Sequence, residues 1–490
     1  MNRPVFHPSL SLLSEELVSR ILDEAFQLLM DPGVRVDSPE ARELLVAAGA
    51  QVDRARSVAH LPEKIVRTAL EYAPSAFSLY NLVGQPVVQY GGRAFHFDPG
   101  SSGVHILDPE TGEHRPALTS DLVRLLKTAE QLPQYAAQST AVVCSDVPEQ
   151  IGDLYRLYLV LLYSSKPIVT GAFSSQTTQV MIDMLAAVSG GHRELAARPR
   201  AVFDVCPSPP LIWTEFASRN LIDLARAGVP AQIVSMPLAG AAAPVTLLGS
   251  IVQHATECLC GITIHQLASP GAPVVWGGAP AIFDMRHGTT PMGAIETAML
   301  DIGYAQIGQS FNLPTHAYLG ASDAKVIDAQ AGLESGISAT LAALAGINMI
   351  SGAGMLDFLN CQSAEKLAID AEAIAMAQRL CSGFQMHTDT LAKEFFAGMA
   401  FKGEFLKQKA TRLLFAKEQH LPSKIIDRGS IRAWEQSGRQ DAFDRARVRV
   451  EELLETYQRP HIDPLLEHEL VRIVTHYAEL AGMPRLPELL

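Results

Sequence analysis

From about residue 95 onward, the chain repeats one order of hydrophobic and polar positions. A short and almost wholly apolar run is followed by a loop rich in Gly, Pro, Ser or Asp, and then by a stretch with the apolar spacing of an amphipathic helix. Eight such units follow one another. The apolar runs predict strands at residues 95–97, 140–144, 167–170, 201–205, 231–235, 273–276, 315–319 and 347–350. The helices after them are predicted to begin near Thr119, Ile151, Gln176, Thr214, Pro244, Ala294, Asp328 and Ala364.

This repeat predicts an α/β fold with a parallel sheet. The strands are short and apolar on both faces, and the connections are long enough for right-handed crossovers. Eight repeats favour a closed (β/α)8 TIM barrel. The alternative, an open doubly wound sheet, would usually need fewer repeats and a phosphate-binding Gly signature, and the sequence contains neither a G-x-G-x-x-G nor a Walker loop.

The segments on either side of the barrel differ from it. Residues 1–90 are predicted to form a helical N-terminal cap, residues 91–384 the barrel and catalytic domain, and residues 385–490 a helical C-terminal extension. That extension is expected to pack on the barrel or to form a subunit interface of a homo-oligomer. Residues 104–116 predict a small β-hairpin over the barrel mouth.

Composition narrows the classes of function. The chain has 490 residues, of which 48% are hydrophobic and 19% charged, which is typical of a well-buried globular protein. The net charge of −13 is unfavourable for nucleic-acid binding, although one local Arg or Lys can still hold an anionic substrate. We therefore expect no nucleic-acid partner.

The cysteines and the longest apolar stretches bear on the compartment. Six scattered cysteines without a Cys-x-x-Cys pair, and a start without a signal-peptide core, indicate reduced thiols in the cytoplasm. The weakly charged stretch at residues 227–283 is repeatedly broken by Gly, Pro, Ser and Gln. We therefore expect a soluble protein that does not span a membrane.

The loop after the seventh predicted strand is unusually polar. It carries Ser322, Asp323, Lys325, Asp328 and Gln330 at a strand-to-helix junction, where α/β folds place ligands and chemistry. Helix capping by Asp328 is the simpler explanation for that residue. Asp323 and Gln330 are the candidate catalytic residues, and we expect them to shape the pocket instead of transferring protons.

Aromatic residues near the strand ends suggest a cage for a cation. Phe97, Trp276, Phe283 and Tyr318 could bring ring faces to one pocket, where each ring contributes about 0.5 to 2 kcal/mol to binding a quaternary ammonium. Ordinary core packing is the alternative for each ring. Arg286 or His287 could bind a substrate carboxylate, or could equally be solvated loop charges.

Two further chemistries are weaker. Lys325 could form a Schiff base at a strand end, but Asp323 and Asp328 in the same loop favour simple ion pairing. His254, Cys258, Cys260 and His265 lie in one helical stretch. Helix geometry separates the two histidines by about 16 Å and turns the two cysteines apart, so no metal site is predicted.

Several motifs together carry a family resemblance over nearly the whole chain. They are Leu13-Ser-Glu-Glu-Leu, Ser38-Pro-Glu-Ala, Asp108-Pro-Glu-Thr-Gly-Glu-His-Arg, Ser145-Asp-Val-Pro, Pro244-Val-Thr-Leu-Leu-Gly, Gly320-Ala-Ser-Asp-Ala-Lys, Asp328-Ala-Gln-Ala-Gly and Gly352-Ala-Gly-Met-Leu. On these motifs the chain resembles the trimethylamine methyltransferase family, in its branch without pyrrolysine, whose best-known activity is glycine betaine:corrinoid methyltransfer.

The resemblance implies a (β/α)8 barrel that moves a methyl group from a methylated amine to the cobalt of a separate corrinoid protein. It implies no tightly bound cofactor in this chain, because the partner supplies the corrinoid. Trimethylamine-specific members carry pyrrolysine, which this sequence lacks, so a quaternary amine such as glycine betaine is the expected substrate. The alternatives are direct transfer to tetrahydrofolate, a Schiff-base lyase that uses Lys325, and a non-catalytic betaine-binding protein.

Overall fold

Eight parallel strands form a closed barrel in the computed structural model, which describes residues 8–387, 390–397, 401 and 403–489. The strands are β6 (His96–Pro99), β9 (Gln138–Ser139), β10 (Ile168–Thr170), β11 (Ala201–Val205), β13 (Ala231–Ser235), β15 (Val274–Gly278), β17 (His316–Ala317) and β18 (Met349–Ala353). Strands β9 to β15 pair as one sheet, and β17, β18 and β6 pair as another. Parallel bridges from Trp276 to Thr315 and from Phe97 to Tyr135 join the two sheets and close the barrel.

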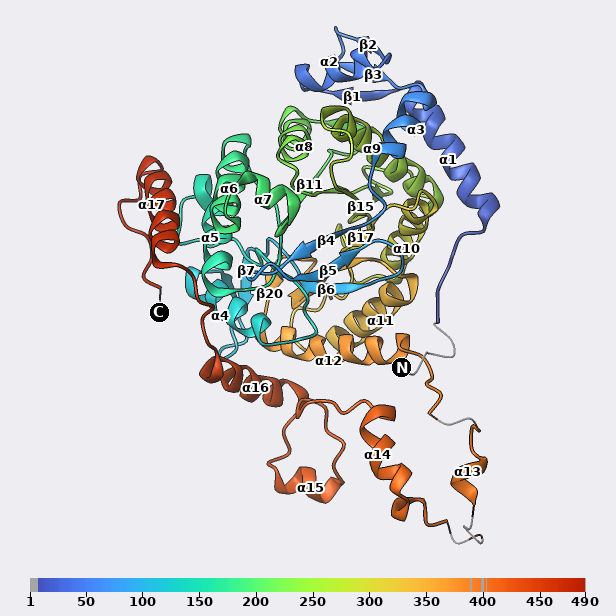
Figure 1. The fold of residues 1–490 in the computed structure, drawn as a ribbon, viewed down its shortest axis with the longest axis vertical. Helices are drawn as coiled ribbons and strands as arrows, with labels where there is room; N and C mark the ends of the chain where they lie inside the picture. The colour runs from blue at the N-terminus through green and yellow to red at the C-terminus, as the bar shows by residue number, and fades with distance from the viewer. Residues whose placement is uncertain (1–7, 388–389, 398–400, 402, 490) are drawn as a thin grey trace.

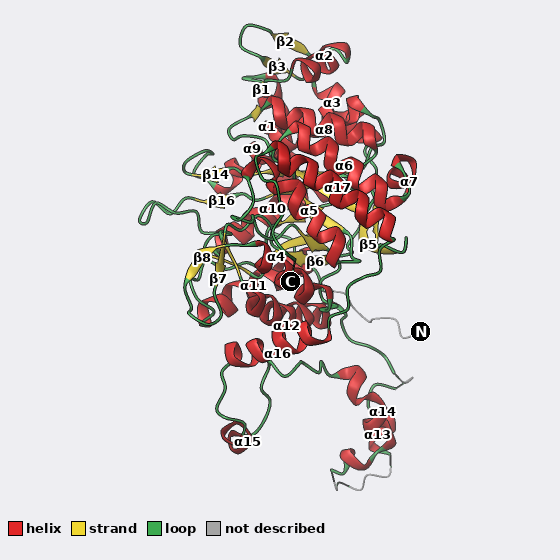
Figure 2. Cartoon of the chain, turned by 90° about the vertical axis from the view of Figure 1, so that its left-hand side faces the viewer, coloured by secondary structure: helices red, strands yellow, loops and turns green. Residues whose placement is uncertain are grey.

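The helices surround the barrel as the repeat predicts (Figures 1 and 2). They are α4 (Thr119–Glu130), α5 (Gly152–Tyr163), α6 (Ser175–Ser189), α8 (Glu215–Ala227), α9 (Leu247–Ala268), α10 (Ile295–Ser310), α11 (Ala329–Ala345) and α12 (Ala364–Cys381). Short helices η1 (Glu149–Ile151) and α7 (His192–Ala197) lie in the connections. The predicted (β/α)8 barrel is therefore confirmed.

Side chains at the helix starts explain why the repeat was readable. Ser174, Thr214, Thr246 and Ser363 each accept a hydrogen bond from a backbone N–H in the first turn of the helix that follows. Asp328 does the same for α11, since its carboxylate accepts from the N–H groups of Gln330 and Ala331. Such caps satisfy backbone donors that the helix itself leaves open.

The second strand lies earlier than predicted. Residues 140–144 are apolar, but the barrel strand is Gln138–Ser139. Beyond Ser139 the chain turns toward the loop after β6, where Val142 forms a bridge with Gly103. A buried segment next to a strand is as apolar as the strand itself, so the hydrophobic pattern does not separate the two.

A hairpin closes the amino-terminal end of the barrel. It consists of β4 (Phe77–Tyr80) and β5 (Pro86–Tyr90), which pair antiparallel. Its side chains Leu79, Val88 and Tyr90 form one buried cluster with residues of the barrel strands, namely Val169, Val202, Val275 and Met349. The opposite, carboxyl-terminal end therefore remains as the mouth.

The N-terminal segment has three helices and also a small sheet. The helices are α1 (Glu15–Met30), α2 (Pro39–Ala47) and α3 (Glu63–Tyr72). Strands β1 (Val34–Val36), β2 (Gln51–Asp53) and β3 (Val58–His60) pair with β12 (Ile212–Trp213) from the barrel domain. The sequence did not predict these strands, because a run of three residues is too short to show a period of two.

Short strands also frame the mouth. The predicted hairpin is present as β7 (His105–Leu107) and β8 (His114–Pro116), and β19 (Met355–Leu356) and β20 (Cys361–Gln362) extend its sheet. A second pair, β14 (Leu238–Ala239) and β16 (Ala281–Ile282), follows β13 and β15.

The C-terminal part leaves the barrel and returns to it. Helices α13 (Lys393–Phe396), α14 (Lys409–Glu418) and α15 (Ile431–Gln436), with η2 (Phe405–Lys407), extend away from the body in Figure 1. Helix α16 (Ala442–Thr456) then packs against α4 and α12, and α17 (Pro464–Leu480) packs against α5 and α6.

Helix α9 is long and apolar enough to cross a membrane, and it is the one such helix in the described residues. Its most apolar window is 83% buried inside the protein. It packs against α1, α3, α8 and α10, so burial accounts for its composition, as in a core helix of a soluble protein.

Candidate functional site

The inner face of the barrel carries the polar residues of the candidate site. Successive side chains of a strand point to opposite faces, so Asp98, Asp204 and Gln232 point inward while Phe97 and Ile233 point toward the helices. His316 from β17 and Ser351 from β18 join them, as their hydrogen bonds show. Together these residues place two carboxylates near the barrel axis.

One carboxylate is half-buried at the mouth and held from two sides. The Tyr318 hydroxyl donates to Asp204 Oδ2 at 2.7 Å, and Gln232 Nε2 donates to Asp204 Oδ1 at 2.6 Å. Burial raises the pKa of Asp204 to about 6. At pH 7 Asp204 is therefore mostly ionised, and it makes no ion pair among the described residues.

The other carboxylate is deeper and keeps its proton. Ser351 Oγ donates to Asp98 Oδ1 at 2.6 Å, while Asp98 Oδ2 has no partner in the described structure. Burial, with the Asp204 charge adding to it, raises the pKa of Asp98 well above its usual range. His316 Nε2 lies 3.1 Å from Ser351 Oγ, and burial lowers the pKa of His316 to about 3, so its imidazole is neutral.

Cys206 shows that the mouth is concave. Its side chain is exposed to solvent, yet burial raises the pKa of its thiol to about 12. Both hold for a group on the wall of a hollow, where a water molecule reaches the side chain but protein surrounds it. Cys206 is therefore a thiol, and not a thiolate, at neutral pH.

A buried guanidinium lies at the side of this mouth. Arg156 of α5 is fully buried; its Nη1 donates to Thr140 O at 2.9 Å and Ser102 Oγ at 3.1 Å. The Arg156 Nη2 has no partner, and the Phe173 ring lies 4.6 Å from its Cζ. Burial lowers the pKa of Arg156 to about 10, so it stays charged at pH 7. The negative charge of ionised Tyr318 acts on this pKa, which places Arg156 within electrostatic range of the Tyr318 hydroxyl.

Sequence reasoning missed Arg156, Asp204 and Asp98. Arg156 is the one Arg or Lys of α5, between Leu154 and Tyr163, and every residue of that helix is buried. A charged residue within so apolar a run was the available signal, because Arg is rarely buried without a partner.

The four predicted ring residues do not meet at one point. Tyr318 lines the mouth, and Phe283 is half-buried on the loop after β16. Phe97 packs edge-on against Phe95 with ring centres 6.2 Å apart, and Trp276 packs against His254 and Phe311. Both are buried in the main hydrophobic core, on the outer face of their strands.

Arg286 and His287 lie on an exposed loop. Arg286 is 82% exposed and pairs with Asp284 at 2.6 Å, and His287 is 70% exposed and approaches the same carboxylate at 3.3 Å. The Arg286 hydrogen bond holds the pKa of Asp284 well below its usual range. These residues pair within their own loop, in contrast to the buried Arg156.

Asp323 and Gln330 have different surroundings. Asp323 is buried and accepts from the N–H groups of Met292 and Gly293 at 2.8 and 2.9 Å, which ties the loop before α10 to the loop before α11. Burial raises its pKa to about 6. Gln330 is exposed and donates to Glu334 on the same helix.

Lys325 is engaged in ion pairing. Its Nζ donates to Asp323 O at 2.6 Å, lies 3.0 Å from Asp357, and lies 3.6 Å from the centre of the Phe358 ring. Nothing in this geometry favours a Schiff-base lyase. In the described part of the chain, no three His, Cys, Asp or Glu side chains converge as a metal site.

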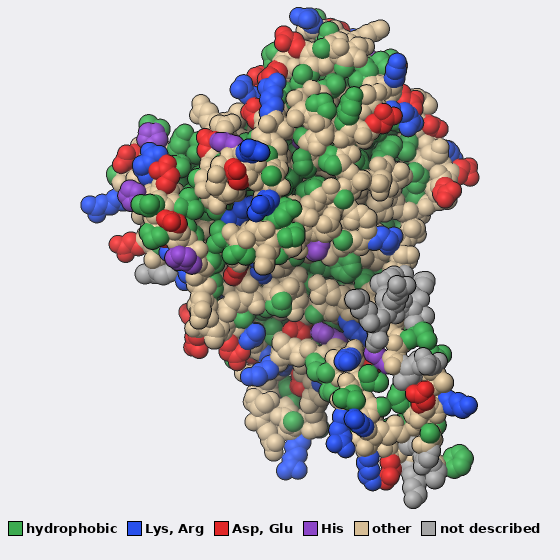
Figure 3. All heavy atoms as spheres, in the orientation of Figure 1, with side chains coloured by type: hydrophobic (Ala, Val, Ile, Leu, Met, Phe, Trp, Pro, Cys, Tyr) green, Lys and Arg blue, Asp and Glu red, His purple; other side chains and the backbone are tan. Residues whose placement is uncertain are grey.

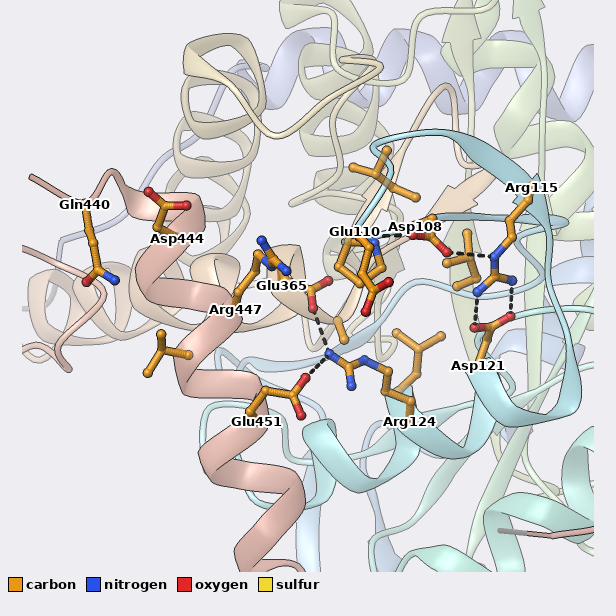
Figure 4. A pocket seen from close by; sticks show the side chains of 16 residues that line it. Asp108, Glu110, Arg115, Asp121, Arg124, Glu365, Gln440, Asp444, Arg447 and Glu451 are labelled. Carbon is orange, nitrogen blue, oxygen red and sulfur yellow. Dashed lines mark hydrogen bonds and ion pairs between the residues drawn. The ribbon is translucent and has the colours of Figure 1, made fainter. Parts of the chain in front are cut away.

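The largest cleft, of about 490 Å³, lies outside the barrel (Figure 4). It separates α4 and the mouth hairpin from α16. Its Arg124 bridges Glu365 and Glu451, and its Arg115 holds Asp121. Because these charges neutralise one another and none belongs to a barrel strand, we place the candidate site at the mouth instead.

Comparisons with known proteins agree with this architecture. The family model of trimethylamine methyltransferase (MTTB) matches residues 3–480. The chain is 30% identical to trimethylamine methyltransferase MttB of Desulfitobacterium hafniense, over 96% of this chain and 95% of that protein. It is 27% identical to a glycine betaine methyltransferase of the same species, over 97% and 98% of the two chains.

A solved structure supports the fold. The crystal structure of the Methanosarcina barkeri monomethylamine methyltransferase MtmB matches with a TM-score of 0.53 at 11% identity, and covers 91% of this chain and 89% of that one. With the family model matching almost the full length, the chain is a methyltransferase that belongs to the trimethylamine methyltransferase family.

Proposed function

We propose that the protein moves a methyl group from a quaternary amine that carries a carboxylate, glycine betaine or a related betaine, to the Co(I) of a separate corrinoid protein. The observation that carries this proposal is the charge pattern of the mouth. One ionised carboxylate, Asp204, and one buried guanidinium with a free donor, Arg156, match the two opposite charges of a betaine.

Asp204 suits the ammonium end. A quaternary ammonium has no hydrogen-bond donor, so it is attracted by charge and by ring faces alone. Both Asp204 oxygens already accept a hydrogen bond, from Tyr318 and Gln232, and the half-buried carboxylate still carries an unpaired charge. A cation beside it is stabilised more than in bulk water because the surrounding dielectric is low.

Arg156 suits the carboxylate end. Its Nη2 is a buried donor without a partner, which is costly unless a ligand or water satisfies it. A charge-assisted hydrogen bond to a carboxylate is the strongest that a guanidinium makes. Binding through this remote group does not resist the loss of positive charge from nitrogen as the methyl group leaves.

The reaction then needs alignment more than proton transfer. The C–N bond breaks with its electron pair going to nitrogen, so the product is a neutral tertiary amine and no proton has to be supplied. The corrinoid, as the methyl acceptor brought by its own protein, supplies the nucleophile. In agreement, Asp98, His316 and Cys206 all hold one protonation state near neutral pH, and the barrel wall orients the substrate and excludes water.

The remaining assignments follow from this proposal. The chain holds no corrinoid of its own, and the corrinoid protein approaches the mouth, where Phe173, Met236 and Met285 expose apolar side chains. Asp323 positions the loops that frame the mouth, and Gln330 lies where the partner approaches. Residues 91–384 form the catalytic unit, and the enzyme acts in the cytoplasm.

Methylation of free cob(I)alamin, followed by its absorbance spectrum, tests the proposal with glycine betaine, proline betaine, carnitine, butyrobetaine and trimethylamine as donors. We expect activity with at least one betaine and none with trimethylamine. Activity with trimethylamine alone contradicts the proposal. Methyl transfer to tetrahydrofolate without any corrinoid would move the function to direct folate methylation.

A further inference from the structure

The segment at residues 384–440, here called the arm, leaves the body and is hardly covered by it. It contains α13, η2, α14 and α15, and none of their described side chains is buried. Ile425 is buried, and the Ser423 N–H bonds to Glu372 of α12, so the arm is anchored near its end. Figures 1 and 3 show the arm extending from the lower part of the molecule.

The arm exposes many large apolar side chains. Exposed residues include Phe384, Leu391, Phe396, Leu406, Leu413, Phe415, Leu421 and Ile431, and Leu406 is 86% exposed. Contiguous apolar surface of this kind marks an interaction site on a soluble protein. The arm helices have four, ten and six residues, and isolated helices below about 12 residues are marginal in water. A partner is therefore needed to hold them.

A second uncovered apolar face lies on α10 and α11. Ile295 and Met299 of α10, and Leu333 and Ile337 of α11, are exposed one turn apart on neighbouring helices. On α11 the space outside Gly332 and Gly336 is open, so another backbone can approach closely. By contrast α4, α5 and α9 are covered by α16, α17 and α1, respectively.

The two surfaces have opposite charge. Residues 384–440 carry ten Lys or Arg and six Asp or Glu, a net charge of +4, which leaves −17 for the rest of the chain. Exposed Lys409, Arg412 and Lys417 of α14 make no ion pair among the described residues. Exposed Glu296 and Asp328 border the α10 and α11 face. Opposite charges favour association of these surfaces and disfavour arm-to-arm contact.

We propose that the chain forms a homo-oligomer in which the arm of one copy covers the α10 and α11 face of another. Apolar side chains of the arm pack on Ile295, Met299, Leu333 and Ile337, and its basic side chains face Glu296 and Asp328. In a two-fold dimer this contact forms twice. Because α10 and α11 begin at the loops that Asp323 ties together, the partner copy also supports the barrel mouth.

Sedimentation velocity and light scattering on the full chain, over a range of protein concentrations, test this inference. Two variants address the two sides: Leu406→Glu with Leu413→Glu on the arm, and Leu333→Glu with Ile337→Glu on the face. Leu480→Glu on α17, also exposed, is the matched control. We expect an oligomer for the wild type and the control, and at least tenfold weaker association for both double variants, with unchanged circular dichroism.

A charge swap separates direct contact from general damage. Arg412→Glu and Glu296→Arg should each weaken association, and their combination should restore part of it. A monomeric wild type overturns the proposal, as does an oligomer that neither double variant weakens. A monomer whose arm variants lose only binding of the corrinoid protein overturns it too, since the arm would then serve that partner. Methyl transfer by a dissociated variant is measured separately, so failure of the proposed function remains distinguishable.

Discussion

At the scale of single residues, the side of the strand decides the role of a side chain. Phe97 and Asp98 are neighbours, but Phe97 packs among the helices and Asp98 lies near the barrel axis. Parallel strands buried on both faces show no alternation of apolar and polar residues. The sequence therefore indicates where a strand is, but not which of its residues face inward, and so it identified Tyr318 without its partner Asp204.

Replacing Asp204 by Asn removes the charge while keeping a group that can accept hydrogen bonds. We expect the KM for betaine to rise about 10- to 100-fold, in line with the loss of about 1.5 to 3 kcal/mol from a charged interaction. Tetramethylammonium, as a competitive inhibitor, should weaken by a similar factor. Unchanged inhibition by tetramethylammonium would contradict the role given to Asp204.

The pKa of Asp204 also predicts a pH dependence. Since burial raises this pKa from 3.8 to about 6, the carboxylate is protonated below that pH and betaine affinity should fall there. The folded state also binds this proton more tightly than the unfolded chain, so this residue's contribution to stability falls as pH rises from about 4 to about 6. In Asp204→Asn both dependences should be reduced, as measured by ligand titration and by denaturant unfolding between pH 4 and 8.

Arg156 should discriminate between substrates with and without a carboxylate. Arg156→Gln removes the charge, and we expect about a 10- to 100-fold loss in kcat/KM with betaine, but little change in inhibition by tetramethylammonium. Arg156→Lys keeps the charge and should lose less. Because Arg156 also bonds Thr140 O and Ser102, circular dichroism must show that each variant folds.

At the scale of elements, capping and turn chemistry made the helices predictable. Asp328, Thr214 and Thr119 stand where the pattern placed the helix starts, because each helix needs acceptors for its first N–H groups. The second strand and the three short N-terminal strands could not be placed, because two or three residues carry too little pattern and pairing with distant segments decides their structure.

The Asp328 cap predicts a contrast between two helices. Asp328→Ala should lower the free energy of unfolding by about 0.5 to 2 kcal/mol, because α11 is part of the barrel core. Ser430→Ala removes a similar cap from α15, which buries no side chain, and should change global stability by less than about 0.5 kcal/mol. Denaturant unfolding of both variants, under conditions where each is monomeric, tests this contrast. Equal losses would show that α15 belongs to the cooperative core.

At the scale of the whole molecule, the eightfold repeat was sufficient to predict the barrel. What the repeat cannot reveal is how the ends of the barrel are finished, since the hairpin β4–β5 and the mouth sheets come from insertions outside the repeat. The same holds for the arm, whose helices were predicted but whose separation from the body depends on tertiary contacts.

The hairpin at the closed end should matter for stability and not for chemistry. Leu79→Ala removes a fully buried side chain from the cluster with Val169 and Val275, and should cost about 2 to 5 kcal/mol. Val83→Ala, in the exposed turn of the same hairpin, should cost almost nothing. The KM for betaine of the folded Leu79→Ala enzyme should equal that of the wild type, and a large change in KM would show that the hairpin shapes the site.

The closed end also constrains the order of events in the proposed reaction. With β4 and β5 filling one end of the barrel, the small amine has to use the opening on which the acceptor protein docks. The amine must therefore enter before docking and its demethylated product must leave after undocking. Steady-state kinetics should accordingly show a compulsory order, with high concentrations of the acceptor protein inhibiting turnover when betaine is scarce.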